Sequence, residues 1–175
     1  MNVLSHALIP VIASSFDVKR SRVESESSYW NAKRLTFLAV CGAAPDLLDP
    51  HLYLASRLSS WSHGVPALLG VALVLFSLSR AGKFGLETRL AAWGVSAYAL
   101  HLCCDAISGG IAPLYPLSPV VIGTYYIPPV LWPMLDFGFL FIAYFLRFAL
   151  PRWLATRARA TGARHRGDCN SSGQG

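Results

Sequence analysis

Five apolar segments separated by short polar connections constrain this 175-residue chain more than any other feature. They cover about residues 2–16, 35–48, 64–79, 90–108 and 134–150. A helix that crosses a membrane needs about 20 apolar residues. The third and fifth segments have the character of membrane helices, whereas the first two are short enough to form a hairpin shielded by the others. Only 14% of the residues are charged, against about 25% in soluble domains. The pattern therefore predicts an all-α, multi-pass membrane bundle of about five helices.

The placement of basic residues predicts an orientation for this bundle. Fourteen of the 15 Lys and Arg residues lie in the last turn of the fifth segment or after the first, third or fifth segment, and only Arg57 falls on the other side. Lys and Arg concentrate on the cytoplasmic side of inner-membrane proteins. We therefore expect the start of the chain outside and its end in the cytoplasm.

The two ends of the chain carry further predictions. The basic cluster KRSR follows the first apolar segment, whereas a signal peptide has its positive charge before the apolar run, so this segment is expected to be retained. Residues 1–154 are predicted to form the membrane-embedded domain, and 155–175 a basic, disordered tail. The net charge of +6 does not indicate a nucleic-acid partner, because the basic residues lie between apolar runs and not on a polar folded face.

The stretch HLCCDAISGG places two ionisable groups in an apolar segment. His101 and Asp105 are four residues apart and so share one helix face. An aspartate at membrane depth costs about 2.5–3.5 kcal/mol. Under the predicted orientation, further His and Asp residues come to the same outer end: His6, Asp46, Asp49, His51, His63 and Asp136. A divalent cation would remove both the burial cost and the mutual repulsion, and a mixture of imidazole and carboxylate suits zinc, with manganese or iron as alternatives.

Each of these groups also has a local interpretation. Asp49 precedes Pro50 and could cap or turn the chain, and Asp136 lies near a helix start, where the helix dipole favours a carboxylate. Neither local role explains why all the groups share one end. Asp49, His51 and Asp136 are accordingly expected to make outer contacts or caps.

At these residues the sequence resembles a bacterial family of multi-pass inner-membrane proteins described as metal-dependent hydrolases, also called LexA-binding inner-membrane-associated hydrolases. The resemblance covers about residues 1–136 and rests on SHALIP, GAAPDLLDPH, WSHG and HLCCDAISGGIAPLYPLSP. Two features differ: Asp49 comes one residue later than the second aspartate of the family's PD-x-D, and His63 stands without the histidine that commonly precedes it.

The order His, Asp, His, His-x-x-x-Asp is also similar to that of zinc-dependent phospholipase C. That likeness implies a set of metal ligands: His6, Asp46, His63, His101 and Asp105. Asp46 could instead be the base. The further His-x-x-x-Glu pair of those enzymes is missing, which favours one or two metal ions. The likeness also implies a phosphate ester as substrate, and at a membrane a lipid headgroup is the natural one.

The leading functional hypothesis is therefore metal-assisted hydrolysis at the outer face of the inner membrane, with Asp46 or Asp49 accepting a proton. The uncharged loop 109–133, with Tyr115, Tyr125 and Tyr126, could shape an apolar mouth for a membrane lipid. Two alternatives stay open. One is an ion- or proton-coupled transporter, since buried ionisable residues mark ion pathways. The other is a non-enzymatic scaffold with a structural metal.

Overall fold

The computed structural model describes residues 3–15, 28–50, 58–153 and 156–157. Within these ranges the chain is helical, with five α-helices and no strand. The α-helices are α1 (Val3–Ser14), α2 (Ser28–Leu48), α3 (Val65–Arg80), α4 (Thr88–Ile107) and α5 (Trp132–Tyr144). Short helical turns lie at η3 (Trp61–His63), η4 (Lys83–Gly85) and η5 (Pro129–Leu131), and α5 continues through a π-helical turn, η6 (Phe145–Ala149).

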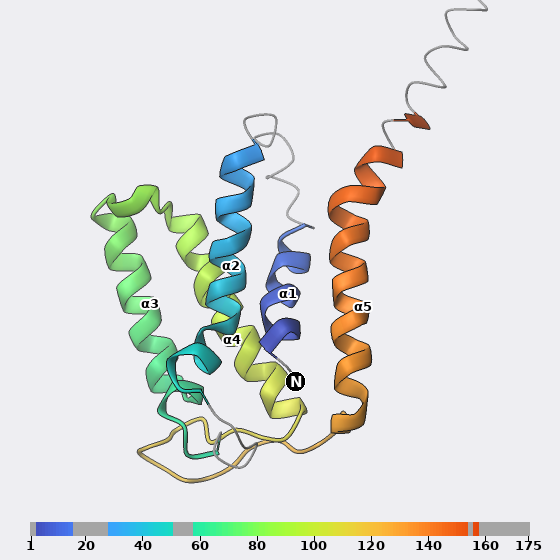
Figure 1. The fold of residues 1–175 in the computed structure, drawn as a ribbon. Helices are drawn as coiled ribbons and strands as arrows, with labels where there is room; N and C mark the ends of the chain where they lie inside the picture. The colour runs from blue at the N-terminus through green and yellow to red at the C-terminus, as the bar shows by residue number, and fades with distance from the viewer. Residues whose placement is uncertain (1–2, 16–27, 51–57, 154–155, 158–175) are drawn as a thin grey trace, which may run out of the picture.

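The five helices run in alternating directions, so that α1 begins at the end of the bundle opposite the one where α5 finishes (Figure 1). α4 lies at the centre and packs against α2 and α3, while α1 packs against α2, α4 and α5. Tyr98 and Leu102 of α4, together with Ile111, form the buried apolar core. This arrangement brings one end of α1, α2, α3 and α4 together around the start of η3.

The helices predicted from the third, fourth and fifth apolar segments are confirmed as α3, α4 and α5. The helix predicted from the second apolar segment, 35–48, was too short. The observed helix α2 begins at Ser28 and has 21 residues, so the first two helices are not both short. Two helical stretches, Thr88–Ile107 and Pro129–Trp153, are long and apolar enough to cross a membrane. That the other helices also cross the membrane stays a prediction. The disordered tail predicted for 155–175 also stays a prediction, because most of those residues lie outside the described ranges.

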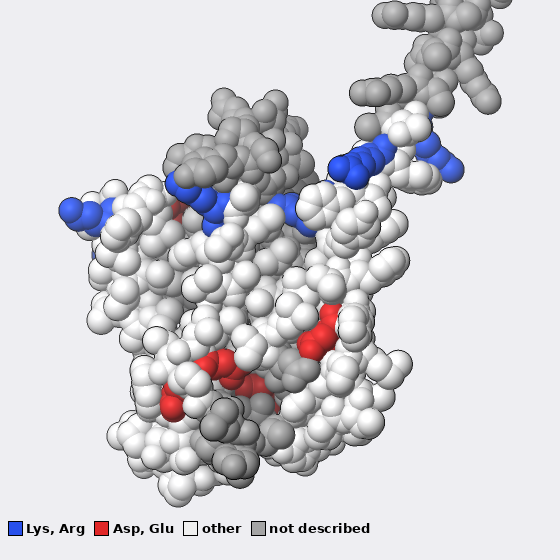
Figure 2. Space-filling model, in the orientation of Figure 1, with Lys and Arg blue, Asp and Glu red and all other residues white. Residues whose placement is uncertain are grey.

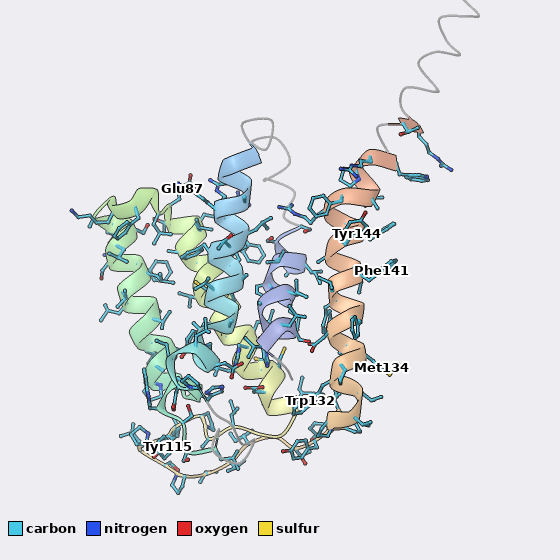
Figure 3. All side chains as sticks on the ribbon, in the orientation of Figure 1. Glu87, Tyr115, Trp132, Met134, Phe141 and Tyr144 are labelled. Carbon is cyan, nitrogen blue, oxygen red and sulfur yellow. The ribbon has the colours of Figure 1, made fainter. Side chains whose placement is uncertain are left out.

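Charge separates along the length of the bundle. On the face drawn in Figure 2, Lys and Arg gather at the end where α2 begins and α3 meets α4, and acidic groups lie mostly toward the other end. Glu87 is an acidic residue at the basic end, and it pairs there with Arg34 at 3.0 Å. Figure 3 places Glu87 and Tyr144 toward this end and Tyr115 and Trp132 toward the opposite one. The separation expected from the basic residues is therefore present in the fold, whichever side faces the cytoplasm.

The predicted loop after α4 is ordered and folds back on the end of that helix. The backbone N–H groups of Thr124 and Tyr126 donate to the carbonyls of Ala106 and Ile107 at 3.1 and 3.0 Å. The loop comes so close at Gly123 (φ 95°) that a Cβ there would lie 2.0 Å from the Ala106 carbonyl oxygen. Only glycine tolerates both this φ and this contact. The loop therefore forms a fixed floor beneath the end of α4 that carries the ionisable residues.

Candidate metal centre

Four elements bring ionisable residues to one point inside the bundle. α1 contributes His6, α2 contributes Asp46, η3 contributes His63, and α4 contributes His101 and Asp105. Four of the five are buried, with at most 2% of their surface exposed, and the side chain of Asp46 is 17% exposed. The predicted convergence of these five residues is thus present in the fold, and Asp46 lies at its accessible edge.

The carboxylate of Asp105 is in contact with three imidazoles. Its Oδ1 lies 3.2 Å from Nε2 of His6. Its Oδ2 lies 3.3 Å from Nε2 of His63 and 3.2 Å from Nε2 of His101. His101 and Asp105 therefore share one face of α4, as their i, i+4 spacing predicted. The carboxylate lies at the centre of the cluster.

Four ligand atoms have the dimensions of a metal site. Nε2 of His63 and of His101 are 3.3 Å apart, and Oδ1 of Asp46 lies 3.3 and 3.7 Å from them. With Oδ2 of Asp105, all four atoms lie within 4.8 Å of one another. Four atoms at about 2.0–2.1 Å from a tetrahedral ion are about 3.3 Å apart. The printed distances of 3.3–3.7 Å are close to this value, so the group is compatible with one metal ion bound by two nitrogens and two oxygens.

The surroundings of His101 determine which ring nitrogen carries its proton. Nδ1 lies 2.7 Å from the carbonyl oxygen of Gly42. A carbonyl only accepts hydrogen bonds, so Nδ1 is the donor, and in the neutral ring Nε2 holds a lone pair. This lone pair points into the cluster. A backbone carbonyl that orients a histidine in this way is a common feature around bound metals.

His63 is oriented by two serines with the same result. Ser62 Oγ donates to the carbonyl of Pro45 at 2.8 Å, and Ser60 Oγ donates to Oδ2 of Asp49 at 2.7 Å. Each hydroxyl has a single proton, so neither can also donate to the Nδ1 of His63 that lies 3.0 and 3.1 Å away. Nδ1 of His63 is therefore the donor, and in the neutral ring its Nε2 presents a lone pair to the cluster.

These lone pairs and carboxylates need a positive charge between them. Two facing nitrogen lone pairs repel, as do two buried carboxylates, and burial without compensation is costly. Burial lowers the pKa of His63, but the hydrogen bonds to Asp105 and Asp46 raise it by more, so the net shift is upward. A proton on this ring is one way to compensate. A divalent cation is a more complete one, because its charge of two balances the two carboxylates.

His6 lies beside this four-atom group and is not one of its members. Its ring stacks on that of His101, with centroids 3.8 Å apart, and its Nε2 faces the outer oxygen of Asp105. Among the described residues, Nδ1 of His6 has no hydrogen-bond partner. The ring is therefore placed next to the site, and its role as a ligand remains a prediction.

The residues expected at the periphery occupy different positions. Asp49 accepts from Ser60 and so supports His63 from outside the cluster. Asp136 of α5 accepts a hydrogen bond from Ser5 Oγ, which ties α5 to α1 next to His6. His51 lies outside the described residues. A direct catalytic role for Asp49 stays a prediction.

The sequence-based prediction missed the groups that orient the ligands: the Gly42 carbonyl, Ser60, Ser62 and Tyr98. The hydroxyl of Tyr98 donates to the carbonyl of Ser62 at 2.5 Å and so fixes η3 against α4. Three of these residues lie inside or beside motifs that had been noted, GAAPDLLDPH and WSHG. Their place in these motifs was a signal that they belong to the site. Their roles could not be predicted, because their hydrogen-bond partners lie in other segments of the chain.

Comparison with known proteins found one family. A family model described as YdjM inner membrane protein matches residues 1–166, nearly the whole chain. No curated protein and no solved structure matches the sequence. The family supports a location at the inner membrane.

Proposed function

This chain belongs to the YdjM inner membrane protein family, and we propose that it is a metal-dependent hydrolase that cleaves a phosphate ester of a membrane lipid. The observation that carries the proposal is the four-atom group of Asp46, His63, His101 and Asp105. Its two nitrogens are held in the tautomer that binds a metal, and its charge suits a divalent ion. Because the cluster lies at the end opposite the basic residues, the proposal places it on the non-cytoplasmic side.

The proposed roles follow from burial and orientation. His63, His101 and Asp105 are almost fully enclosed and would hold the ion, zinc in the first place and manganese or iron as alternatives. When bound, the metal would lower the pKa of a water molecule and polarise the ester. Asp46 is the one member with an accessible edge. It would either complete the ligand set or accept the proton of the attacking water.

The first experiment measures metal in the detergent-purified full chain and its His101→Ala and Asp105→Ala variants. The wild type should carry about one divalent ion, and both variants should lose it, because each removes a ligand. Glu87→Ala is the matched control, since this carboxylate lies at the opposite end and pairs with Arg34. The same samples are then assayed on phospholipids and on a soluble phosphodiester with added zinc or manganese. Turnover that persists in His101→Ala would point to a contaminating enzyme.

Asp46→Asn separates the two roles of Asp46. If Asp46 is a ligand, the variant releases metal. If it is the base, the variant keeps metal and slows turnover, typically by about 10²–10⁴-fold. A protein that binds no metal would contradict the proposal and favour a carrier of ions or protons instead.

A second candidate is a membrane scaffold with a structural metal. One observation favours it: the group offers four protein ligand atoms to one ion, and catalytic zinc usually keeps one of four positions open. Tightly held metal without turnover on any phosphate, carboxylic or amide substrate would support this candidate and exclude the hydrolase.

A further inference from the structure

An apolar groove of about 510 Å³ runs along α3. Its walls come from α3, from the end of α2, from η3 and from the loop after α4. None of the described residues that line it is charged. Its volume falls within the range of small-molecule sites, about 300–1,000 Å³. The lining includes Leu48, Trp61, Val74 and Tyr115, which makes it suited to a hydrocarbon chain and not to a polar ligand.

One of the α3 residues that line the groove is a glycine, Gly70. A Cβ added to Gly70 would meet no atom within 4 Å, so the space above it is open. The glycine has ordinary helical geometry, and nothing in the local backbone requires it. Glycine inside a helix costs roughly 0.5–1 kcal/mol relative to alanine. A larger side chain at this position would therefore project into the groove.

One end of the groove lies near the elements that carry the candidate metal centre. Trp61 in its wall is two residues from His63, and Leu48 is two residues from Asp46. The loop residue Tyr115 sits against the same corner, because its carbonyl oxygen lies 3.0 Å from where a Cβ of Gly64 would be. From this corner the groove extends along α3 from Pro66 to Leu75, which is about 14 Å at the helical rise of 1.5 Å per residue.

We propose that this groove holds an acyl chain of a phospholipid whose headgroup lies at the metal centre. The inference rests on the proposed function and adds how the substrate is recognised: by one apolar chain lying along α3 with its polar end at Asp46. An apolar chain is the occupant because the lining residues that the structure describes are uncharged and because the chain matches a family of inner membrane proteins. Of the three tyrosines predicted to shape an apolar entrance for a lipid, Tyr115 is the one that lines this groove.

The test uses the full chain in phospholipid vesicles that contain a small fraction of phosphatidylglycerol with a diazirine-tailed acyl chain. After illumination, cross-linked positions are mapped by mass spectrometry. Gly70→Phe adds a large side chain to the groove lining, at a position where a Cβ meets no atom within 4 Å. Gly138→Phe is its matched control, because Gly138 lies in helix α5 and a Cβ there also meets no atom within 4 Å. Neither variant touches the metal centre.

In the wild type and in Gly138→Phe, labels should appear on Trp61, Val74 or their neighbours. In Gly70→Phe these labels should fall about tenfold relative to labels on α5, since displacing only two methylenes weakens binding by about that factor. An unchanged ratio would overturn the groove proposal. Labelling needs neither metal nor turnover, so its outcome is independent of the hydrolase test. If both proposals hold, Gly70→Phe loses turnover of long-chain lipid and keeps that of the soluble phosphodiester.

Discussion

Gly42→Ala tests whether the candidate metal centre depends on the close approach of α1 to α2. A Cβ on Gly42 would lie 2.4 Å from the carbonyl oxygen of His6 and 2.8 Å from Pro10 Cγ. Ordinary contacts of a Cβ begin at about 3.4 Å. Since the carbonyl is backbone, it cannot rotate away, and α1 must retreat by about 1 Å. His6 would move with it, away from Asp105.

The cost of this substitution follows from the same geometry. Overpacking of a close contact typically costs about 1–3 kcal/mol. For a chain of this size each kcal/mol shifts Tm by about 2–4 °C, so Gly42→Ala should lower Tm by about 2–12 °C. The Gly42 carbonyl also accepts from His101, and a displaced carbonyl loosens that ring. Bound metal should therefore fall together with stability.

The assay is thermal unfolding and metal content of the detergent-purified full chain, wild type and variant side by side. Gly138→Ala is the control, because it makes the same chemical change on a helix where a Cβ meets nothing within 4 Å. It should keep the metal and unfold at the wild-type temperature or slightly above it, since alanine favours helix. A Gly42→Ala protein with wild-type Tm and full metal content would refute the packing of α1 on α2 described above.

Three further outcomes are expected. Ser62→Ala removes the hydroxyl that orients one imidazole and should weaken metal affinity about 10–100-fold in a chelator competition, whereas Ser79→Ala, on the exposed side of α3, should not. Tyr98→Phe removes one buried hydrogen bond and should destabilise the protein by about 0.5–1.5 kcal/mol in a melting experiment. A reporter active only in the cytoplasm should be active when fused after Gly175 and silent at Ser118, and the reverse would contradict the predicted orientation.

The sequence predicted three helices well because their apolar runs extend over most of their length. It placed the start of α2 too late, at residue 35 and not at Ser28. The missed residues include Lys33 and Arg34, which hydropathy alone assigns to a connection. In the fold they form the charged end of the helix, where Arg34 pairs with Glu87. A pairing of residues 53 positions apart leaves no local signal.

The members of the candidate site were predicted for a different reason. His101 and Asp105 share a helix face, which spacing alone determines. His6, Asp46 and His63 were added because the basic residues predicted that they all lie at one end. The orientation predicts at which end of the bundle these residues lie, but it does not predict the distances between their side chains. It could not foresee that the oxygens of Gly42 and Ser62 would determine the tautomers, because these contacts depend on how closely α2 and η3 meet α4.

The cluster joins four segments that are far apart in sequence, α1, α2, η3 and α4, and Ser5 connects α5 to it through Asp136. In lipid, helices gain little from the hydrophobic effect on association, so packing and polar contacts hold them together. Any ion bound here would therefore stabilise the bundle, by an amount that grows with the logarithm of its concentration divided by its Kd. A rise in Tm on adding zinc would be expected of the hydrolase and of the scaffold alike. The two differ in what Asp46 does, because only a hydrolase needs it to exchange its place with water or to take a proton. Turnover by the wild type that is slowed or lost in Asp46→Asn therefore separates them where stability does not.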